Sequence, residues 1–221
     1  MLKTVRVWDL PTRIFHWALV MCIVGSVTTS QIGGNAMPWH FRFGYCIAGL
    51  LLFRLVWGFV GGRWSRFASF IYSPATVLRY LKGVVRPEHA VGHNPLGAGS
   101  VFAMLLFLLA QVGSGVFSDD EIAASGPFTK FVSEATVSMA THYHKGIGKY
   151  VLLGLVVLHI AAIVFYLVRR RENLVRPMLT GDKAVRATVQ DSRDDGRSRL
   201  MAAVILALCA ALIAWSLKVA G

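Results

Sequence analysis

Five apolar runs, each long enough to cross a lipid bilayer, alternate with polar segments along the chain. They cover about residues 14–32, 40–60, 95–117, 142–171 and 200–219. An α-helix rises 1.5 Å per residue, so about 20 apolar residues span the hydrocarbon core of a bilayer. The pattern therefore predicts an all-α integral membrane protein, with a four-helix transmembrane bundle and an additional fifth transmembrane helix.

The polar segments predict three regions. Residues 1–171 would form the four-helix membrane domain, and residues 200–221 the fifth transmembrane helix. Between them, residues 172–199 are charged and end in DSRDDGRSR, a composition typical of an exposed segment, so we expect a polar cytoplasmic linker there. The fifth run contains no histidine, and we expect it to pack against the bundle or to dock a partner.

The basic residues predict the orientation of the chain. Most of the lysines and arginines, 17 of 23, lie in three segments: the N-terminal segment, residues 61–94 and residues 169–199. Two membrane-spanning runs separate each of these segments from the next, so all three would lie on the same side of a membrane. By the positive-inside rule that side is cytoplasmic, so the N-terminus would be cytoplasmic and the C-terminus periplasmic in a bacterial inner membrane. The formal charge of +12 also suits nucleic acid, but the arginines cluster beside apolar runs. We therefore expect membrane lipid as a partner and no nucleic acid.

Four histidines sort by depth into two pairs. His16 opens the first run and His159 lies ten residues before Arg169, so both are near the cytoplasmic side. His40 and His144 each open a run on the outer side. His144 and His159 are 15 positions apart, which leaves them about 60° apart on one helix and roughly 22 Å apart in depth. The fourth helix would then contribute one imidazole to each pair.

Two imidazoles from two helices at one depth are typical of bis-histidine haem. Two axial nitrogens make the iron six-coordinate and suited to electron transfer, and helix bundles build such sites between facing helices. Zinc would favour clusters with cysteine or acidic residues, and a proton relay would favour acidic residues within the spans. The three cysteines form no C-x-x-C-H signature, so covalent c-type haem is not indicated.

Other readings of single residues remain open. A lone histidine at a helix end is usually an interfacial or hydrogen-bonded residue. His142 is the alternative to His144, although it lies about 100° off the face of His159. His89 and His93 lie in the cytoplasmic connector, His93 directly before the cap of a helix, and are left out of the ligand set. Arg54 either extends toward the lipid headgroups or pairs with a buried anion, and we predict that it pairs with a haem propionate.

Several motifs together resemble the prokaryotic di-haem cytochrome b family that includes the membrane subunits of nickel-iron hydrogenase and formate dehydrogenase. The resemblance covers roughly residues 5–170 and rests on VWDLPTRIFHW, HFRFG, FRLVWGFVG, GHNPLG and HKGIG…LHIAAI. It implies haem ligation by the same four residues, His16, His40, His144 and His159. Two features depart from the family: the spacing in the fourth helix is one residue longer than the family pattern, and four-helix members lack the fifth helix.

The resemblance implies an electron-transfer subunit of the oxidoreductase type. It would hold two non-covalent haem b groups and pass electrons between the quinone or quinol pool and a redox partner, which is a periplasmic hydrogenase, a dehydrogenase or a c-type cytochrome. Two other functions remain open. One is a structural membrane anchor for a redox complex, and the other is a self-contained quinone oxidoreductase.

Overall fold

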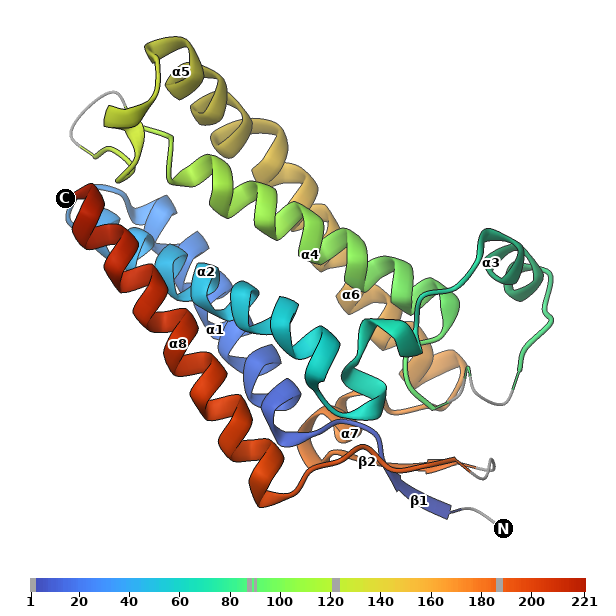
Figure 1. The fold of residues 1–221 in the computed structure, drawn as a ribbon. Helices are drawn as coiled ribbons and strands as arrows, with labels where there is room; N and C mark the ends of the chain where they lie inside the picture. Colours follow the sequence, from blue (N-terminus) through green and yellow to red (C-terminus); the bar gives the residue numbers. More distant parts are fainter. Residues whose placement is uncertain (1–2, 87–88, 90, 121–123, 186–188) are drawn as a thin grey trace. The chain divides into compact units, whose positions relative to one another are not determined.

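The computed structural model of the chain is predominantly helical (Figure 1). It describes residues 3–86, 89, 91–120, 124–185 and 189–221. Within these residues, five helical stretches are long and apolar enough to cross a membrane, which confirms the five helices expected from the sequence. They are α1 (Leu10–Ile32), α2 (Met37–Val60) with the turn before it, α4 (Pro95–Gly115), the stretch Glu134–Arg169, and α8 (Gly196–Ala220).

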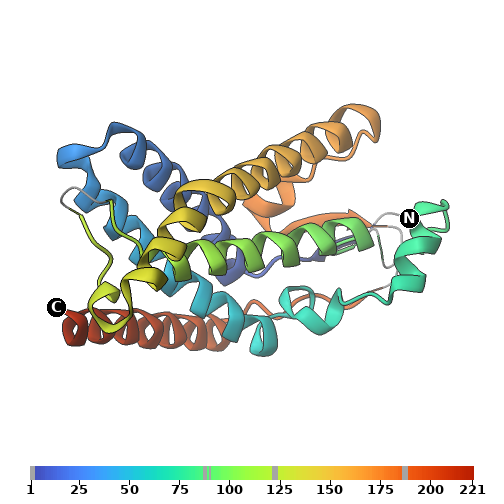
Figure 2. The ribbon, with the colours of Figure 1, turned by 90° about the horizontal axis from the view of Figure 1, so that it is seen from above.

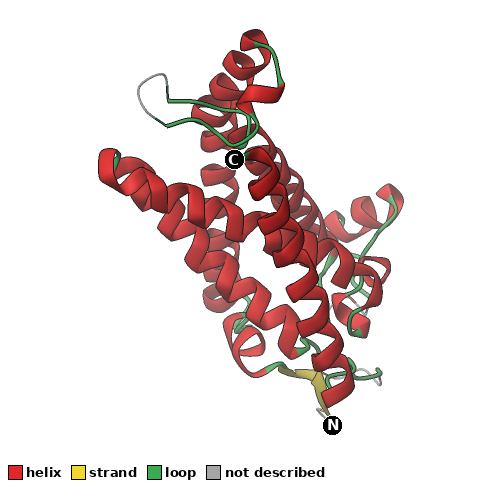
Figure 3. Ribbon diagram, turned by 60° about the vertical axis from the view of Figure 1, so that its left-hand side comes forward, coloured by secondary structure: helices red, strands yellow, loops and turns green. Residues whose placement is uncertain are grey.

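Shorter elements connect the long helices. The stretch Glu134–Arg169 consists of α5 (Glu134–Tyr143), a π-turn (His144–Gly148) and α6 (Lys149–Arg169). The connectors contain α3 (Pro74–Leu81) and α7 (Val175–Thr180), and α8 runs unbroken to the end of the chain (Figure 2). The two named strands, drawn in yellow in Figure 3, are β1 (Lys3–Arg6) and β2 (Asp182–Val185).

Two compact units divide the chain, and each spanning helix contributes residues to both. The first unit holds residues 1–15, 54–103 and 157–204, and the second holds residues 16–53, 104–156 and 205–221. The first therefore collects the basic segments, and the second collects the loops at the other helix ends. We describe the two units separately.

The first unit contains a pair of strands that lie far apart in the sequence. β1 and β2 pair antiparallel, with Lys3 opposite Val185 and Arg6 opposite Asp182. Their apolar side chains join a small buried core. This core consists of Val5, Val7, Trp8, Trp64, Val91 and Val185.

Part of the segment expected to be an exposed linker is buried in this unit. Ser192 is 4 % exposed and its hydroxyl donates to the Val7 carbonyl (2.7 Å). The Asp194 carboxylate accepts from Arg199 Nε (3.0 Å) and from the Leu10 amide (3.1 Å). Burial by itself would raise the pKa of the Asp194 carboxyl, but the bonds from Arg199 and Leu10 outweigh it and the pKa is lowered. The charged composition of this segment predicted exposure. The groups that bury it, at Val7 and Leu10, lie far away in the sequence and could not be identified from composition.

A fully buried carboxylate anchors the start of α1. Asp9 caps the helix by accepting from the Thr12 amide (2.8 Å). It also accepts from the Gly62 amide (3.0 Å), from Ser65 Oγ (2.7 Å) and from Trp57 Nε1 (3.2 Å). A buried carboxylate is stable only when its oxygens are hydrogen-bonded, and here four donors satisfy them. Asp9 thereby ties α1 to the end of α2 and to the turn that follows it.

The second unit brings α1, α2, α4 and the π-turn together. The Phe43 ring packs directly against Gly25, where a Cβ atom would lie 2.6 Å from the ring. Small residues of this kind let membrane helices approach closely. The Asp119 amide donates to Thr141 Oγ1 (3.1 Å), which joins the loop after α4 to α5. These contacts set the positions of the histidines that the sequence placed on the outer side.

Candidate functional site

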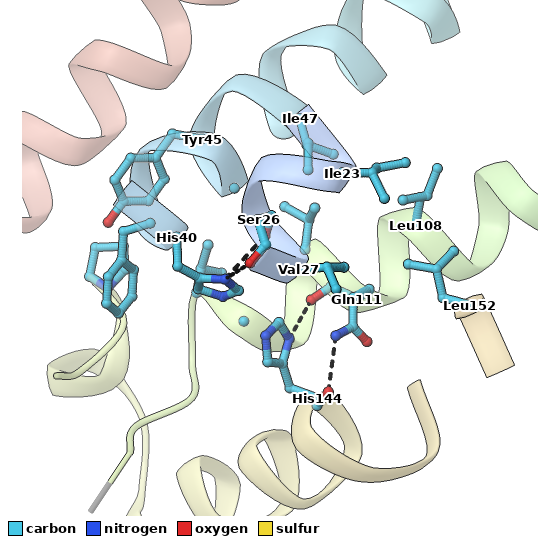
Figure 4. Close-up of a pocket in the computed structure, with 16 residues that line it drawn as sticks. Ile23, Ser26, Val27, His40, Tyr45, Ile47, Leu108, Gln111, His144 and Leu152 are labelled. Atoms are coloured by element: carbon cyan, nitrogen blue, oxygen red, sulfur yellow. Dashed lines mark hydrogen bonds between the residues drawn. The ribbon is translucent and has the colours of Figure 1, made fainter. Parts of the chain in front are cut away.

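His40 and His144 face one another in the second unit (Figure 4). Their ring centroids are 6.0 Å apart and the ring planes are nearly perpendicular, at 81°. His40 lies in the first turns of α2, and His144 opens the π-turn. The sequence predicts these two residues as the outer pair. The alternative residue of the fourth helix, His142, is exposed at the end of α5.

Each ring is held by its Nδ1 atom. His40 Nδ1 bonds to the Ser26 carbonyl (2.9 Å), and His144 Nδ1 bonds to the Gln111 carbonyl (2.8 Å). A carbonyl oxygen can only accept, so each Nδ1 carries the proton and donates it. The proton-free Nε2 of each ring is then available as a metal ligand, which is the usual arrangement for metal-binding histidines.

The two rings border a cavity of about 100 Å³. Its wall is mostly apolar, with Ser26 and Gln111 as polar members. At Gly44, which also lines the cavity, an added Cβ atom would meet nothing within 4 Å. At Gly115 the space is instead filled by the histidine: a Cβ atom there would lie 2.7 Å from His144 Cε1. Glycine at this position is what lets the His144 ring lie against α4.

The residues present fit a bis-histidine haem. A metal–imidazole bond is about 2 Å long, so two imidazoles on opposite sides of one iron have centroids roughly 6 Å apart. The observed separation is 6.0 Å. The open space at Gly44 lies on the same wall, where a flat ring system needs room.

Comparison with known proteins agrees with this chemistry. The family model of prokaryotic cytochrome b561 matches residues 7–181. The chain belongs to this family. It is therefore a multi-pass membrane cytochrome of the b type, for which the family implies haem b and electron transfer.

Curated relatives of this cytochrome cover most of its length. It is 25 % identical over 215 residues to the probable Ni/Fe-hydrogenase B-type cytochrome subunit of Rhizobium leguminosarum bv. viciae, covering 82 % of this chain and 89 % of the relative. It is 24 % identical over 211 residues to the probable Ni/Fe-hydrogenase 1 B-type cytochrome subunit of Escherichia coli (strain K12), covering 79 % and 88 %. No solved structure matches the chain.

A π-turn follows directly after α5 in the fourth spanning stretch of this cytochrome. It covers His144–Gly148, holds one more residue than an α-turn does, and contains Gly146 with non-helical backbone angles (φ −103°, ψ −107°). Turns of this kind inside α-helices frequently occur at functional sites.

Gln111 holds both the ring and the backbone of His144. Its carbonyl accepts from His144 Nδ1, and its side-chain Nε2 donates to the His144 carbonyl (2.9 Å). Gly148 is buried beside it, and a Cβ atom there would collide with Gln111 Oε1. In the sequence, Gln111 is a polar side chain within an apolar run, which is the only signal there of a special role. Its partner lies 33 residues away and is identified only by the structure.

Replacing Gln111 with leucine should loosen the His144 site without removing the imidazole. The loss of the bond to the His144 carbonyl leaves a buried acceptor unpaired, which costs about 1–3 kcal/mol. We expect the haem absorbance to be lost at a lower temperature on heating of the purified protein. Gln190→Leu, the same change at an exposed position, is the control. Equal melting of both variants would show that Gln111 does not hold the site.

His16 and His159 fall in different units. His16 lies in the second unit and contacts Trp17 edge to face, with centroids 5.1 Å apart. His159 lies on α6 in the first unit and is half-buried. Their pairing therefore stays a prediction from the sequence.

Arg54 and His93 lie together in the first unit. Arg54 is only 3 % exposed and its guanidinium stacks over the Phe67 ring at 4.6 Å, so its side chain does not extend to the surface. Burial, together with the smaller effects of the Arg54, His159 and Lys183 charges, lowers the pKa of His93 to about 3, so His93 is neutral at physiological pH.

Proposed function

We propose that this chain is the membrane cytochrome b subunit of a hydrogenase or related redox complex. It holds two haem b groups and passes electrons between the quinone pool and a periplasmic redox partner. The observation that carries the proposal is the His40–His144 pair, two imidazoles 6.0 Å apart with both Nδ1 atoms bonded to carbonyls. The hydrogenase partner is inferred from the names of the relatives.

The ligand residues have distinct tasks in the outer site. When bound, haem would act as a one-electron carrier. His40 and His144 would hold its iron, and the carbonyls of Ser26 and Gln111 keep both rings in the tautomer with a free Nε2. The wall of the cavity is mostly apolar. Ligand rings held in fixed positions are suited to electron transfer, because little has to rearrange when the charge changes.

The inner site is proposed from the membrane depth that the sequence predicts for His16 and His159. His16 and His159 would hold the second haem near the cytoplasmic side, and Arg54 would pair with one of its propionates. With the N-terminus in the cytoplasm and the C-terminus in the periplasm, the outer site faces the periplasmic partner. The two sites would then carry electrons across the bacterial inner membrane.

Haem quantification tests the proposal directly. The pyridine haemochrome assay on purified full-length protein should give two haem b groups per chain, and a reduced-minus-oxidised spectrum should show b-type bands. One haem or none per chain would contradict the two-site arrangement. Hydrogen-dependent reduction of these haems in a complex purified with its hydrogenase would establish the partner.

A structural membrane anchor is the alternative to electron transfer. Under it, His40→Ala should leave electron flow through an assembled complex intact. Loss of electron flow with the complex still assembled would reject the anchor function. Quinone turnover by the chain alone, without a partner, would instead favour a self-contained oxidoreductase.

A further inference from the structure

Three buried nitrogen atoms in the first unit lack a hydrogen-bond partner in the part of the chain that the structure describes: Arg13 Nε, Arg54 Nη1 and His93 Nδ1. Two of them belong to residues that lie close together, Arg54 and His93. Buried polar atoms are almost always hydrogen-bonded, so an orphaned donor indicates a missing ligand or a function. Of these two residues, only Arg54 has a role in the function proposed above, as the partner of a haem propionate.

The buried positive charge of Arg54 requires a compensating anion or hydrogen bonds. Asp9 is a buried carboxylate close enough to act on Arg54 through its charge, but its oxygens already accept from Thr12, Trp57, Gly62 and Ser65. Among the described residues no carboxylate oxygen lies within 4.0 Å of the Arg54 guanidinium. Burying a cation costs several kcal/mol unless an anion or hydrogen bonds compensate. Arg54 therefore has capacity for a second anion that the chain itself does not supply.

His93 is fixed in place by its surroundings. Its ring packs against Trp8 and Phe70, with centroids 4.8 and 4.5 Å away. Its carbonyl accepts from Tyr72 Oη (2.8 Å). The next residue, Asn94, caps α4 by accepting from the Gly97 amide (2.8 Å). A ring held on both faces and through its backbone keeps its Nδ1 atom in one position.

We propose that Arg54 and His93 together bind one propionate carboxylate of the haem held by His159. This deepens the function proposed above and depends on it. A guanidinium and a neutral imidazole N–H form a charged and an uncharged donor, a combination suited to a carboxylate in an apolar site. His159 lies close enough to act on His93 through its charge, which brings the ligand and the carboxylate-binding pair into one region. The phenylalanine rings at 67, 70 and 102 pack on one another beside the pair and supply apolar surface for the body of a ring system.

The test combines protein variants with a haem whose carboxylates are blocked. Full-length protein produced without haem is loaded with haem b or with its dimethyl ester, and both sites are followed by redox titration. We expect the ester to change the reduced-to-oxidised ratio of the inner haem by about tenfold at a fixed potential, which is about 59 mV for one electron. In Arg54→Gln and His93→Phe, haem b and its dimethyl ester should give the same reduced-to-oxidised ratio at the inner site.

Three matched measurements keep the outcome clear. His93→Asn restores a side-chain N–H near the position of Nδ1 and should recover part of the difference, whereas His93→Phe keeps only the packing. Arg63→Gln removes an exposed arginine of the same unit and should preserve the full difference. The resonance Raman bands of the haem propionates should shift in Arg54→Gln and His93→Phe. This measurement does not depend on electron-transfer activity.

Two results would overturn the inference. If both variants keep the wild-type difference between haem and its ester, Arg54 and His93 do not bind the propionate, and the haem proposal stands without them. If the wild-type chain binds neither form of haem, the proposed function fails together with this inference.

Discussion

Replacing His144 with alanine is expected to lower the haem content from two groups to one per chain. His144 is the imidazole that faces His40 at 6.0 Å with its Nδ1 bonded to the Gln111 carbonyl. Without it the outer iron has one protein ligand instead of two, and the six-coordinate site cannot form. Pyridine haemochrome quantification of the purified protein measures the ratio, and His40→Ala should give the same loss.

His142→Ala is the matched control. His142 lies two residues earlier, is exposed, and belongs to the last turn of α5. Its replacement should leave two haems per chain. The opposite pattern, with haem lost in His142→Ala and kept in His144→Ala, would assign the outer ligand to His142 and remove the geometric basis of the site.

Replacing Asp9 with leucine is expected to have the largest effect on stability. Asp9 is fully buried and satisfies donors from Thr12, Trp57, Gly62 and Ser65. An apolar side chain leaves all four unpaired, at a cost of about 3 kcal/mol or more. For a chain of this size the melting temperature should fall by roughly 10 °C, measured by thermal unfolding of the detergent-solubilised protein.

Asp182→Asn provides the comparison for Asp9. Asp182 forms an ion pair with Arg6 Nε at 2.9 Å, but its side chain is 38 % exposed. Exposed ion pairs contribute about 0–1 kcal/mol, so the melting temperature should change by only a few degrees. If Asp9→Leu melts no lower than Asp182→Asn, the buried carboxylate does not hold α1 to the end of α2.

Long apolar runs made the helices predictable, because the bilayer demands about 20 apolar residues wherever a helix crosses it. All five runs are helices in the structure. The choice of His144 over His142 stays a prediction. The structure places His144 beside His40 and leaves His142 exposed. The periodicity argument assumed one regular helix, whereas a π-turn with the non-helical Gly146 lies between His144 and His159.

Contacts between distant residues could not be read in this way. Ser192 bonds to the carbonyl of a residue 185 positions away, so a segment whose composition indicated an exposed linker is partly buried. Gln111 was recognised as a polar residue in an apolar run, but its bonds to His144 depend on how α4 meets the π-turn. The burial of Arg54 likewise depends on the turn that carries Phe67.

The amino-acid sequence by itself determined the number of long apolar helices and identified the histidines that could form ligand pairs. Only the tertiary structure decided which atoms contact the proposed ligand histidines, the Ser26 and Gln111 carbonyls, and which four groups donate to Asp9. The physical reason is that apolar runs and helical periodicity are properties of short stretches of sequence. A hydrogen bond, in contrast, requires two groups within about 3 Å, and only the packing of distant segments brings them there.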